Sequence, residues 1–146
     1  MTILSSAFEH NAFIPVKYTC DGENVNPPLE LKDVPSGTQS LVLVVDDPDA
    51  PRGTWVHWTV WDINFKTAQI AEDSVPASAT EGLTSFGKSG YGGPCPPSGT
   101  HRYFFKLYAL DMTLDLSSTA DKRMLEEAMA GHILGQAELI GLYGRE

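Results

Sequence analysis

Residues 41–61 read LVLVVDDPDAPRGTWVHWTVW, and this stretch carries the strongest signal of the fold. The run from Leu41 to Val45 is continuously apolar and ends at an Asp/Pro cluster, which is typical of a buried strand. Trp55 to Trp61 predicts a second strand, in which simple alternation places His57 on the same face as Thr59. Both faces of this strand are largely apolar, so the stretch predicts two buried strands with a rigid Pro/Gly loop between them.

Strand signals recur later in the chain. His101 to Leu110 alternates clearly, and its side chains His101 and Tyr103 are expected to point the same way. Glu138 to Tyr143 could form the last strand of the sheet. Only Ser118 to Gly131 carries a helical signature, because its first residue can cap a helix, apolar residues recur at 3.6-residue spacing, and a glycine ends it. This pattern favours a mainly β protein, a β-sandwich with a short helix near the C-terminus.

The composition bounds the class of protein. The chain of 146 residues has 42% apolar content, which predicts a single domain over residues 1–146 with a core that is stable without a disulfide or a bound metal. Its formal net charge of −9, with scattered basic residues, argues against a nucleic-acid partner. We expect a cytoplasmic protein without an integral membrane segment, because no secretion signal and no stretch of ~20 apolar residues is found. Cys20 and Cys95 are therefore expected to be free thiols.

The segment from Ser74 to Thr100 has no strand periodicity and holds six glycines between Gly82 and Gly99. Loops of this length are uncommon in compact domains unless they are functional or disordered, and this one leads directly into His101, so we expect a pocket wall. Residues 82–89 match the phosphate-loop pattern G-x-x-x-x-G-K-S. They lack the strand before and the helix after that a phosphate loop needs, so no nucleotide site is expected.

Two Pro/Gly loops place acidic, imidazole and phenolic groups beside strands, as at the rim of a pocket. The first loop runs from Asp46 to Pro51, and the second runs from Gly93 to Tyr103. In the first loop the chain must turn sharply around two prolines. At least one of Pro48 and Pro51 is therefore expected to follow a cis peptide bond.

The polar groups of these loops suggest several kinds of chemistry. We interpret Asp49 as capping its turn through its own backbone, and Asp47 as orienting and charging one imidazole. The carboxylates and imidazoles are metal ligands by type, but no compact spacing supports a metal site, so none is expected. An Asp/His pair could act as a base with Ser98 or Cys95 as the nucleophile, although neither lies in a strand-to-helix elbow.

The two loops, in this order, resemble the signature motifs of the phosphatidylethanolamine-binding protein family, in the short Raf-kinase-inhibitor-like form of its prokaryotic members. The motifs are Asp47-Pro48-Asp49-Ala50-Pro51 and, after a loop of Gly and Pro residues, His101-Arg102-Tyr103. The likeness extends to residues 18–29 and 137–145 and so covers nearly the whole chain. It implies a sandwich of two antiparallel sheets with Greek-key connections.

The resemblance also implies a pocket for a small anion, either phosphate or the phosphate-bearing head group of phosphoethanolamine, with no cofactor. The positions that match the family's pocket are Asp47, His57, Pro97, His101 and Tyr103, with Asp49, Trp55 and Gly93 lining or supporting it. The imidazoles and the phenol would donate hydrogen bonds to phosphate oxygens, and Asp47 would raise the proton affinity of an imidazole. His10 and His132 are interpreted as hydrogen-bonded core residues.

A ligand-binding or regulatory module, not an enzyme, is the function that these residues favour. Two alternatives stay open: a small hydrolase that uses the Asp/His pair, and an inhibitor of a protease or kinase that docks through the pocket rim. The loop before His57 is shorter than the insert of eukaryotic members, so kinase inhibition is not transferred. The protein partner is unknown, and pairing into a homodimer, as in some prokaryotic relatives, also stays open.

Overall fold

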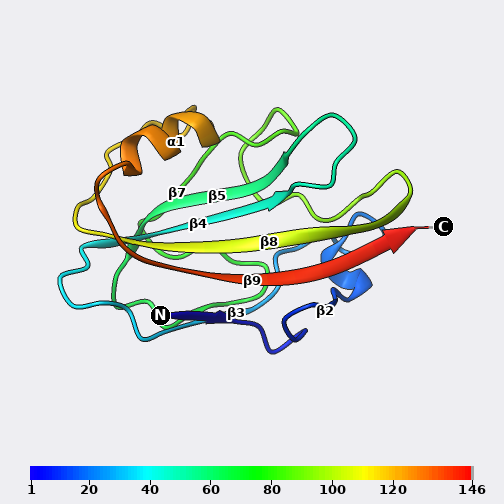
Figure 1. Ribbon diagram of the computed structural model, residues 1–146, viewed down its shortest axis with the longest axis horizontal. Helices are drawn as coiled ribbons and strands as arrows, with labels where there is room; N and C mark the ends of the chain where they lie inside the picture. The colour runs from blue at the N-terminus through cyan, green and yellow to red at the C-terminus, as the bar shows by residue number, and fades with distance from the viewer. Residues whose placement is uncertain (146) are drawn as a thin grey trace.

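Two stacked β-sheets and one short α-helix make up the computed structural model, which describes residues 1–145 (Figure 1). Strands account for 40% of the residues and helices for 8%, so the predicted mainly β sandwich is confirmed. The larger sheet has the order β2 (Ala12–Phe13), β9 (Ile133–Arg145), β8 (Gly99–Leu110), β4 (Ser40–Asp47), β5 (Trp55–Asn64) and β7 (Thr80–Glu81). The smaller sheet has the order β1 (Thr2–Leu4), β3 (Leu29–Lys32) and β6 (Gln69–Ile70). Neighbouring strands are antiparallel, apart from the two-residue parallel pairing of β2 with β9.

The main core fills the space between the two sheets. Side chains alternate along each strand, so every second residue of β4 and β8 faces this space. The larger sheet contributes Leu43, Val45, Trp58, Phe105 and Leu107, and the smaller sheet contributes Ile3, Leu31 and Ile70. His101 and Tyr103 belong to the inward series of β8 and are buried at its end, as the alternation predicted.

The helix α1 (Lys122–Met129) covers the outer face of the larger sheet, on the side opposite the smaller sheet (Figure 1). Leu125 and Met129 are buried there in a second apolar cluster. The side chain of Asp121 caps the helix by accepting a hydrogen bond from the Met124 amide at 3.0 Å. The predicted start at Ser118 is therefore wrong, because Asp121 is the residue whose carboxylate reaches a free amide of the first turn.

A β-bulge changes the face on which His57 lies. Val45 pairs with Trp58 and Asp46 pairs with Val56, so His57 is an extra residue without a partner on β4. The bulge turns His57 towards the inner face, where its ring contacts Tyr103, instead of the outer face that strict alternation predicts. The predicted placement of His57 beside Thr59 is wrong for this reason.

The long segment before β8 is more ordered than its sequence predicts. It contains the short strand β7 and an isolated bridge between Leu83 and Ser89. The amide of Thr84 donates to the Lys88 carbonyl at 3.0 Å, which closes a tight turn over the phosphate-loop pattern. Within residues 1–145 the next element is strand β8 and not a helix, as expected for a chance match to that pattern.

The Asp/Pro loop between β4 and β5 turns without a cis peptide bond. Residues 1–145 contain none, so the expectation of a cis bond before Pro48 or Pro51 is wrong. The carboxylate of Asp47 accepts a hydrogen bond from the Asp49 amide at 2.8 Å, and this local turn redirects the chain with trans bonds.

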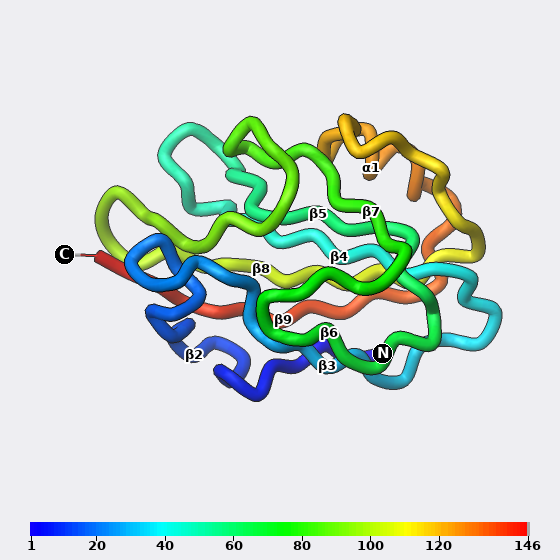
Figure 2. The backbone as a smooth tube through the Cα atoms, turned by 180° about the vertical axis from the view of Figure 1, so that it is seen from behind, coloured from blue at the N-terminus to red at the C-terminus, as the bar shows by residue number. Residues whose placement is uncertain are grey.

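The two cysteines are joined, so the expectation of free thiols is also wrong. Cys20 and Cys95 form a disulfide, and the fold brings their Cα atoms within 5.5 Å although they are 75 positions apart in sequence. Figure 2 shows the two loops side by side, the blue one after β2 and the yellow-green one before β8. No helix among residues 1–145 is both long enough and apolar enough to cross a membrane.

The two remaining histidines lie at the surface and not in the core, which corrects a further prediction. His10 is exposed, and its Nδ1 accepts a hydrogen bond from the Ile140 amide at 3.1 Å. His132 contacts Asp111 at 2.8 Å with 42% of its side chain exposed. Both histidines are hydrogen-bonded as expected, but a backbone amide of β9 and the side chain of Asp111 satisfy them without burial.

Candidate functional site

The ends of three neighbouring strands meet at one end of the larger sheet and enclose a pocket of about 350 Å³. β4 pairs antiparallel with both β5 and β8, so its last residue, Asp47, lies beside the first residues of those strands. The loops that precede β5 and β8 fold over these ends and supply the walls. A pocket of this size suits a small ligand, and its walls are mainly proline and aromatic rings.

Six of the eight predicted site residues line this pocket: Asp47, Trp55, His57, Pro97, His101 and Tyr103. The other two, Asp49 and Gly93, lie outside it. Five further lining residues were not assigned from the sequence: Ala50, Pro51, Phe86, Cys95 and Pro96. Ala50 and Pro51 belong to the first recognised motif, and Cys95 and Pro96 lie in the loop that precedes the second. Phe86 comes from the long segment before β8, and only the expectation of a pocket wall pointed to it.

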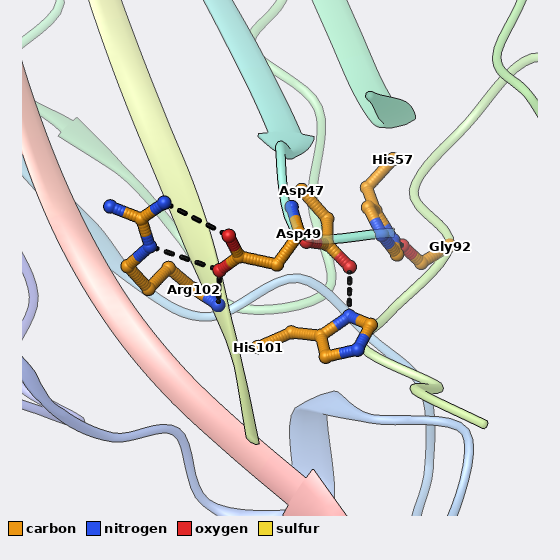
Figure 3. A network of polar contacts seen from close by, with 6 residues as sticks. All are labelled: Asp47, Asp49, His57, Gly92, His101 and Arg102. Atoms are coloured by element: carbon orange, nitrogen blue, oxygen red, sulfur yellow. Dashed lines mark hydrogen bonds and ion pairs between the residues drawn. The ribbon is translucent and has the colours of Figure 1, made fainter. Parts of the chain in front are cut away.

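Asp47 and His101 form a buried pair at the centre of the site (Figure 3). Oδ2 of Asp47 lies 2.6 Å from Nδ1 of His101, and the two side chains are only 5% and 10% exposed. Oδ1 of the same carboxylate accepts the Asp49 amide, so both oxygens are engaged. A carboxylate accepts hydrogen bonds, so Nδ1 of His101 is the protonated nitrogen and Nε2 is left for a ligand.

His57 is held by a backbone carbonyl. Its Nδ1 donates to the Gly92 carbonyl at 2.7 Å, because a carbonyl oxygen can only accept (Figure 3). Its ring also contacts the edges of Phe86 and Tyr103, with centroid distances of 5.4 and 5.2 Å. Burial lowers the pKa of His57, and the Gly92 hydrogen bond and the charge of Asp47 oppose this only in part. His57 is therefore neutral at neutral pH, with an unprotonated Nε2.

Tyr103 supplies a hydroxyl donor to the same pocket. Burial raises the pKa of its phenol, and the negative charge of Asp47 raises it further. The hydroxyl therefore keeps its proton throughout the physiological range. Tyr103 lies between the two imidazoles, with ring centroids 5.2 Å from His57 and 6.5 Å from His101.

Asp49 has a different role from the predicted one, because it binds Arg102 and does not cap its own turn (Figure 3). Its two oxygens accept bonds from Nε and Nη2 of Arg102, and one oxygen also accepts the Arg102 amide, all at 2.9 Å. These hydrogen bonds fix the Asp/Pro loop to the start of β8. Arg102 is part of the recognised motif, but its outward direction on β8 gave no reason to count it as a pocket residue.

Arg102 should control the ionisation of Asp49. Its hydrogen bonds hold the pKa of that carboxyl at about 2, below the usual value, so the pair is lost as the pH falls through that range. We expect Arg102→Ala to raise the pKa of Asp49 towards its ordinary value near 3.9. NMR titration of the Asp49 carboxyl carbon measures the midpoint. Arg123→Ala, on the distant helix α1, is the matched control, and an unchanged midpoint in Arg102→Ala would contradict the assignment.

Gly93 supports the pocket wall through its backbone. Its amide donates to Oδ1 of Asn24 at 2.8 Å, and a Cβ at this position would lie 2.3 Å from the Tyr18 carbonyl oxygen. The next residue, Pro94, accepts a hydrogen bond from the Cys20 amide at 3.1 Å. These contacts and the disulfide dock the wall against the loop that contains Cys20.

The acidic and imidazole side chains of the site do not form a metal cluster. Over residues 1–145, no group of three or more His, Cys, Asp and Glu residues is arranged to hold a metal ion. The nitrogens and oxygens described above are instead bonded to one another, to the backbone, or directed at the pocket.

Comparisons with known proteins agree on one family. Residues 4–144 match the family model described as phosphatidylethanolamine-binding protein. A UPF0098 protein of Methanothermobacter thermautotrophicus is 48% identical over 150 residues, which cover 99% of this chain and 99% of that protein. A UPF0098 protein of Aquifex aeolicus is 47% identical, with coverage of 100% and 90%.

Two crystal structures have the same fold along their whole length. CT736 of Chlamydia trachomatis, described as a phosphatidylethanolamine-binding protein homologue, superposes with a TM-score of 0.95 at 42% identity and covers 99% of this chain and 97% of its own. YbcL of E. coli, described as a new member of the mammalian PEBP family, has a TM-score of 0.93 at 28% identity, with coverage of 99% and 98%.

Proposed function

This chain belongs to the phosphatidylethanolamine-binding protein family, and from that premise we propose that its pocket binds a small anion. The ligand class is phosphate or the phosphate-bearing head group of phosphoethanolamine. The protein then acts as a binding or regulatory module and not as an enzyme. The observation that carries the proposal is the convergence of His57, His101 and Tyr103 around Asp47 in one small pocket.

The hydrogen-bond partners of the imidazoles decide how an anion could be bound. Nδ1 of His101 donates to Asp47, and Nδ1 of His57 donates to Gly92. Each Nε2 therefore carries a proton only when its ring is an imidazolium. Tyr103 offers a donor in either case. Binding of a deprotonated phosphate oxygen at Nε2 thus requires that the imidazole takes up a proton.

Charge balance also couples anion binding to the uptake of a proton by an imidazole. The carboxylate of Asp47 is buried beside His101, so an anion that enters the pocket comes close to a negative charge. It therefore needs a nearby positive charge, and protonation of His57 supplies it. Burial opposes that protonation in the free protein, whereas a bound anion favours it. Affinity is therefore expected to rise as the pH falls from 8 to 6.

Two features support binding over catalysis. Cys95 is in a disulfide, so its sulfur is not available as a thiolate nucleophile. Ser98 is exposed and makes no hydrogen bond to an imidazole among residues 1–145. An activated serine would have to donate to a neighbouring base. Turnover of a phosphoester that disappears in His101→Ala would support the hydrolase alternative instead.

Thermal unfolding in the presence of ligand tests the proposal. Phosphate at ten times its Kd should stabilise the protein by about 1.4 kcal/mol and raise Tm by roughly 2 to 6 °C, more at pH 6 than at pH 8. Chloride at matched ionic strength should have a smaller effect. His57→Ala and His101→Ala should each abolish the shift, whereas the surface variant His10→Ala should keep it.

The ligand needs its own control because phosphate has an ionisation near pH 6. A phosphodiester, which stays a monoanion across this range, separates protonation of the protein from protonation of the ligand. Equal shifts in the parent and in both pocket variants would show that the anion binds elsewhere. No shift in the parent at millimolar ligand would reject the anion site.

A further inference from the structure

The Cys20–Cys95 disulfide is part of the pocket wall and is open to solvent on one side. Cys95 is exposed and lines the pocket, whereas Cys20 is only partly exposed. The flanking residues Pro96 and Pro97 line the same wall. A small thiol that enters the pocket therefore contacts Cys95 and not Cys20.

The two sulfur atoms have different electrostatic surroundings. Nη2 of Arg145 lies 3.3 Å from Sγ of Cys20. The same guanidinium pairs with Asp21, and Asp21 also accepts the Tyr143 hydroxyl at 2.6 Å, so the cation is held in place. Asp21 balances the charge of the guanidinium, but the N–H group directed at the sulfur stabilises the Cys20 thiolate, and a stabilised thiolate leaves faster in disulfide exchange. Cys20 is therefore the better leaving group, and Cys95 is the sulfur that a thiol attacks.

We propose that the Cys20–Cys95 bridge is an exchangeable disulfide, that a small thiol attacks it at Cys95, and that opening it weakens ligand binding in the pocket. In the first step the thiol loses its proton to solvent, and the thiolate forms a bond with Sγ of Cys95. The Cys20–Cys95 bond breaks, and its electron pair remains on Sγ of Cys20 beside Arg145. A second molecule of the thiol, as its thiolate, then attacks the reagent's sulfur in the mixed disulfide, the bond to Cys95 breaks with its electron pair on Sγ of Cys95, and the oxidised reagent is released, which leaves both cysteines reduced.

The wall is attached unequally on the two sides of Cys95. On the upstream side, the Pro94 carbonyl accepts the Cys20 amide at 3.1 Å, a bond that survives reduction. On the downstream side, the segment Pro96–Ser98 takes part in none of the hydrogen bonds found within residues 1–145. The disulfide is thus a covalent attachment of a wall that is otherwise held only at its ends, by Gly93 and Pro94 upstream and by the pairing of β8 with β9 downstream. Its opening gives Pro96–Ser98 more freedom while the rest of the site stays paired.

The exchange step is tested with reduced glutathione and no ligand. The oxidised protein is incubated briefly, free thiols are blocked with N-ethylmaleimide, and the peptides are mapped by mass spectrometry without reduction. Glutathione is expected on Cys95 at least about fivefold more often than on Cys20. Arg145→Gln should slow adduct formation about threefold or more, and the remote control Arg123→Gln should not change it. Equal labelling of both cysteines, or an unchanged rate in Arg145→Gln, would overturn the mechanism.

The coupling to the pocket rests on the proposed function and needs a second measurement. Phosphate binding is measured by calorimetry on the oxidised protein, on the protein reduced with dithiothreitol, and on Cys20→Ser/Cys95→Ser, each shown to be folded by circular dichroism. Both open forms are expected to bind at least about tenfold more weakly, and dithiothreitol should not affect the double variant.

The outcomes separate the two proposals. Equal affinity of the folded oxidised and reduced proteins would overturn the coupling. If the oxidised protein also fails to bind phosphate, the proposed function fails, and the glutathione map still decides the exchange step. If the double variant does not fold, the comparison of oxidised and reduced parent protein decides the coupling.

Discussion

The double variant Cys20→Ser/Cys95→Ser is expected to lose about 4 kcal/mol of the free energy of unfolding. The disulfide joins residues 75 positions apart, and a cross-link that closes so long a loop removes many conformations from the unfolded chain. For a domain of this size the loss should lower Tm by roughly 8 to 16 °C. Urea unfolding followed by tryptophan fluorescence measures it, with linear extrapolation to water.

The reduced parent protein is the matched comparison, because it has the same side chains without the bond. It should unfold at nearly the same urea concentration as the double variant, and dithiothreitol should have no effect on the variant. A loss below about 1 kcal/mol in both would show that the unfolded chain is already compact near this loop. The prediction of a strongly stabilising bridge would then be wrong.

Gly93→Ala is expected to destabilise the protein by about 2 to 3 kcal/mol. The new Cβ would lie 2.3 Å from the Tyr18 carbonyl oxygen and 2.9 Å from the Cα of Thr19. Both are backbone atoms of a segment that packs tightly, since Thr19 is fully buried. The wall must therefore move away from the Cys20 loop, and the same variant should also lose the phosphate-dependent shift in Tm.

Gly87→Ala controls for the general cost of replacing a glycine. Gly87 has φ of 80°, and a Cβ there meets nothing within 4 Å, so only backbone strain of about 1 kcal/mol is expected. Chemical denaturation of both variants separates the free-energy cost of the steric collision at residue 93 from the cost of backbone strain at residue 87. If Gly93→Ala costs no more than Gly87→Ala, the wall is looser than its contacts indicate.

The long strands were predictable because β8 alternates and β4 is a continuous apolar run. The alternation of β8 alone placed His101 and Tyr103 on the same face, and the structure confirms it. The face of His57 was not predictable from β5 alone, because a bulge depends on how two strands are paired. The start of α1 was missed for a similar reason: Ser118 and Asp121 are both good capping residues, and only the backbone path selects Asp121.

Most of the candidate site could be predicted because its motifs are short and contiguous, and the predicted contact of Asp47 with an imidazole is confirmed. Which imidazole it contacts, and the partner of Asp49, could not be predicted. Asp47 and Asp49 are chemically alike, and the strand register assigns one to His101 and the other to Arg102. The disulfide was missed because sequence separation carries no information on distance in the fold. The size of the domain and its expected cytoplasmic location favoured free thiols, but the fold brings the two loops close enough for a disulfide to form.

The position of β4 between β5 and β8 has a consequence for folding. The carboxylate of Asp47 meets an imidazole 54 residues away, and the second imidazole lies on the strand at its other side. No single hairpin contains this set of groups, so the pocket has a high contact order and is complete only when β4 has paired with both β5 and β8. A ligand in it therefore binds the native state alone, and its stabilising effect appears as slower global unfolding with an unchanged rate of refolding.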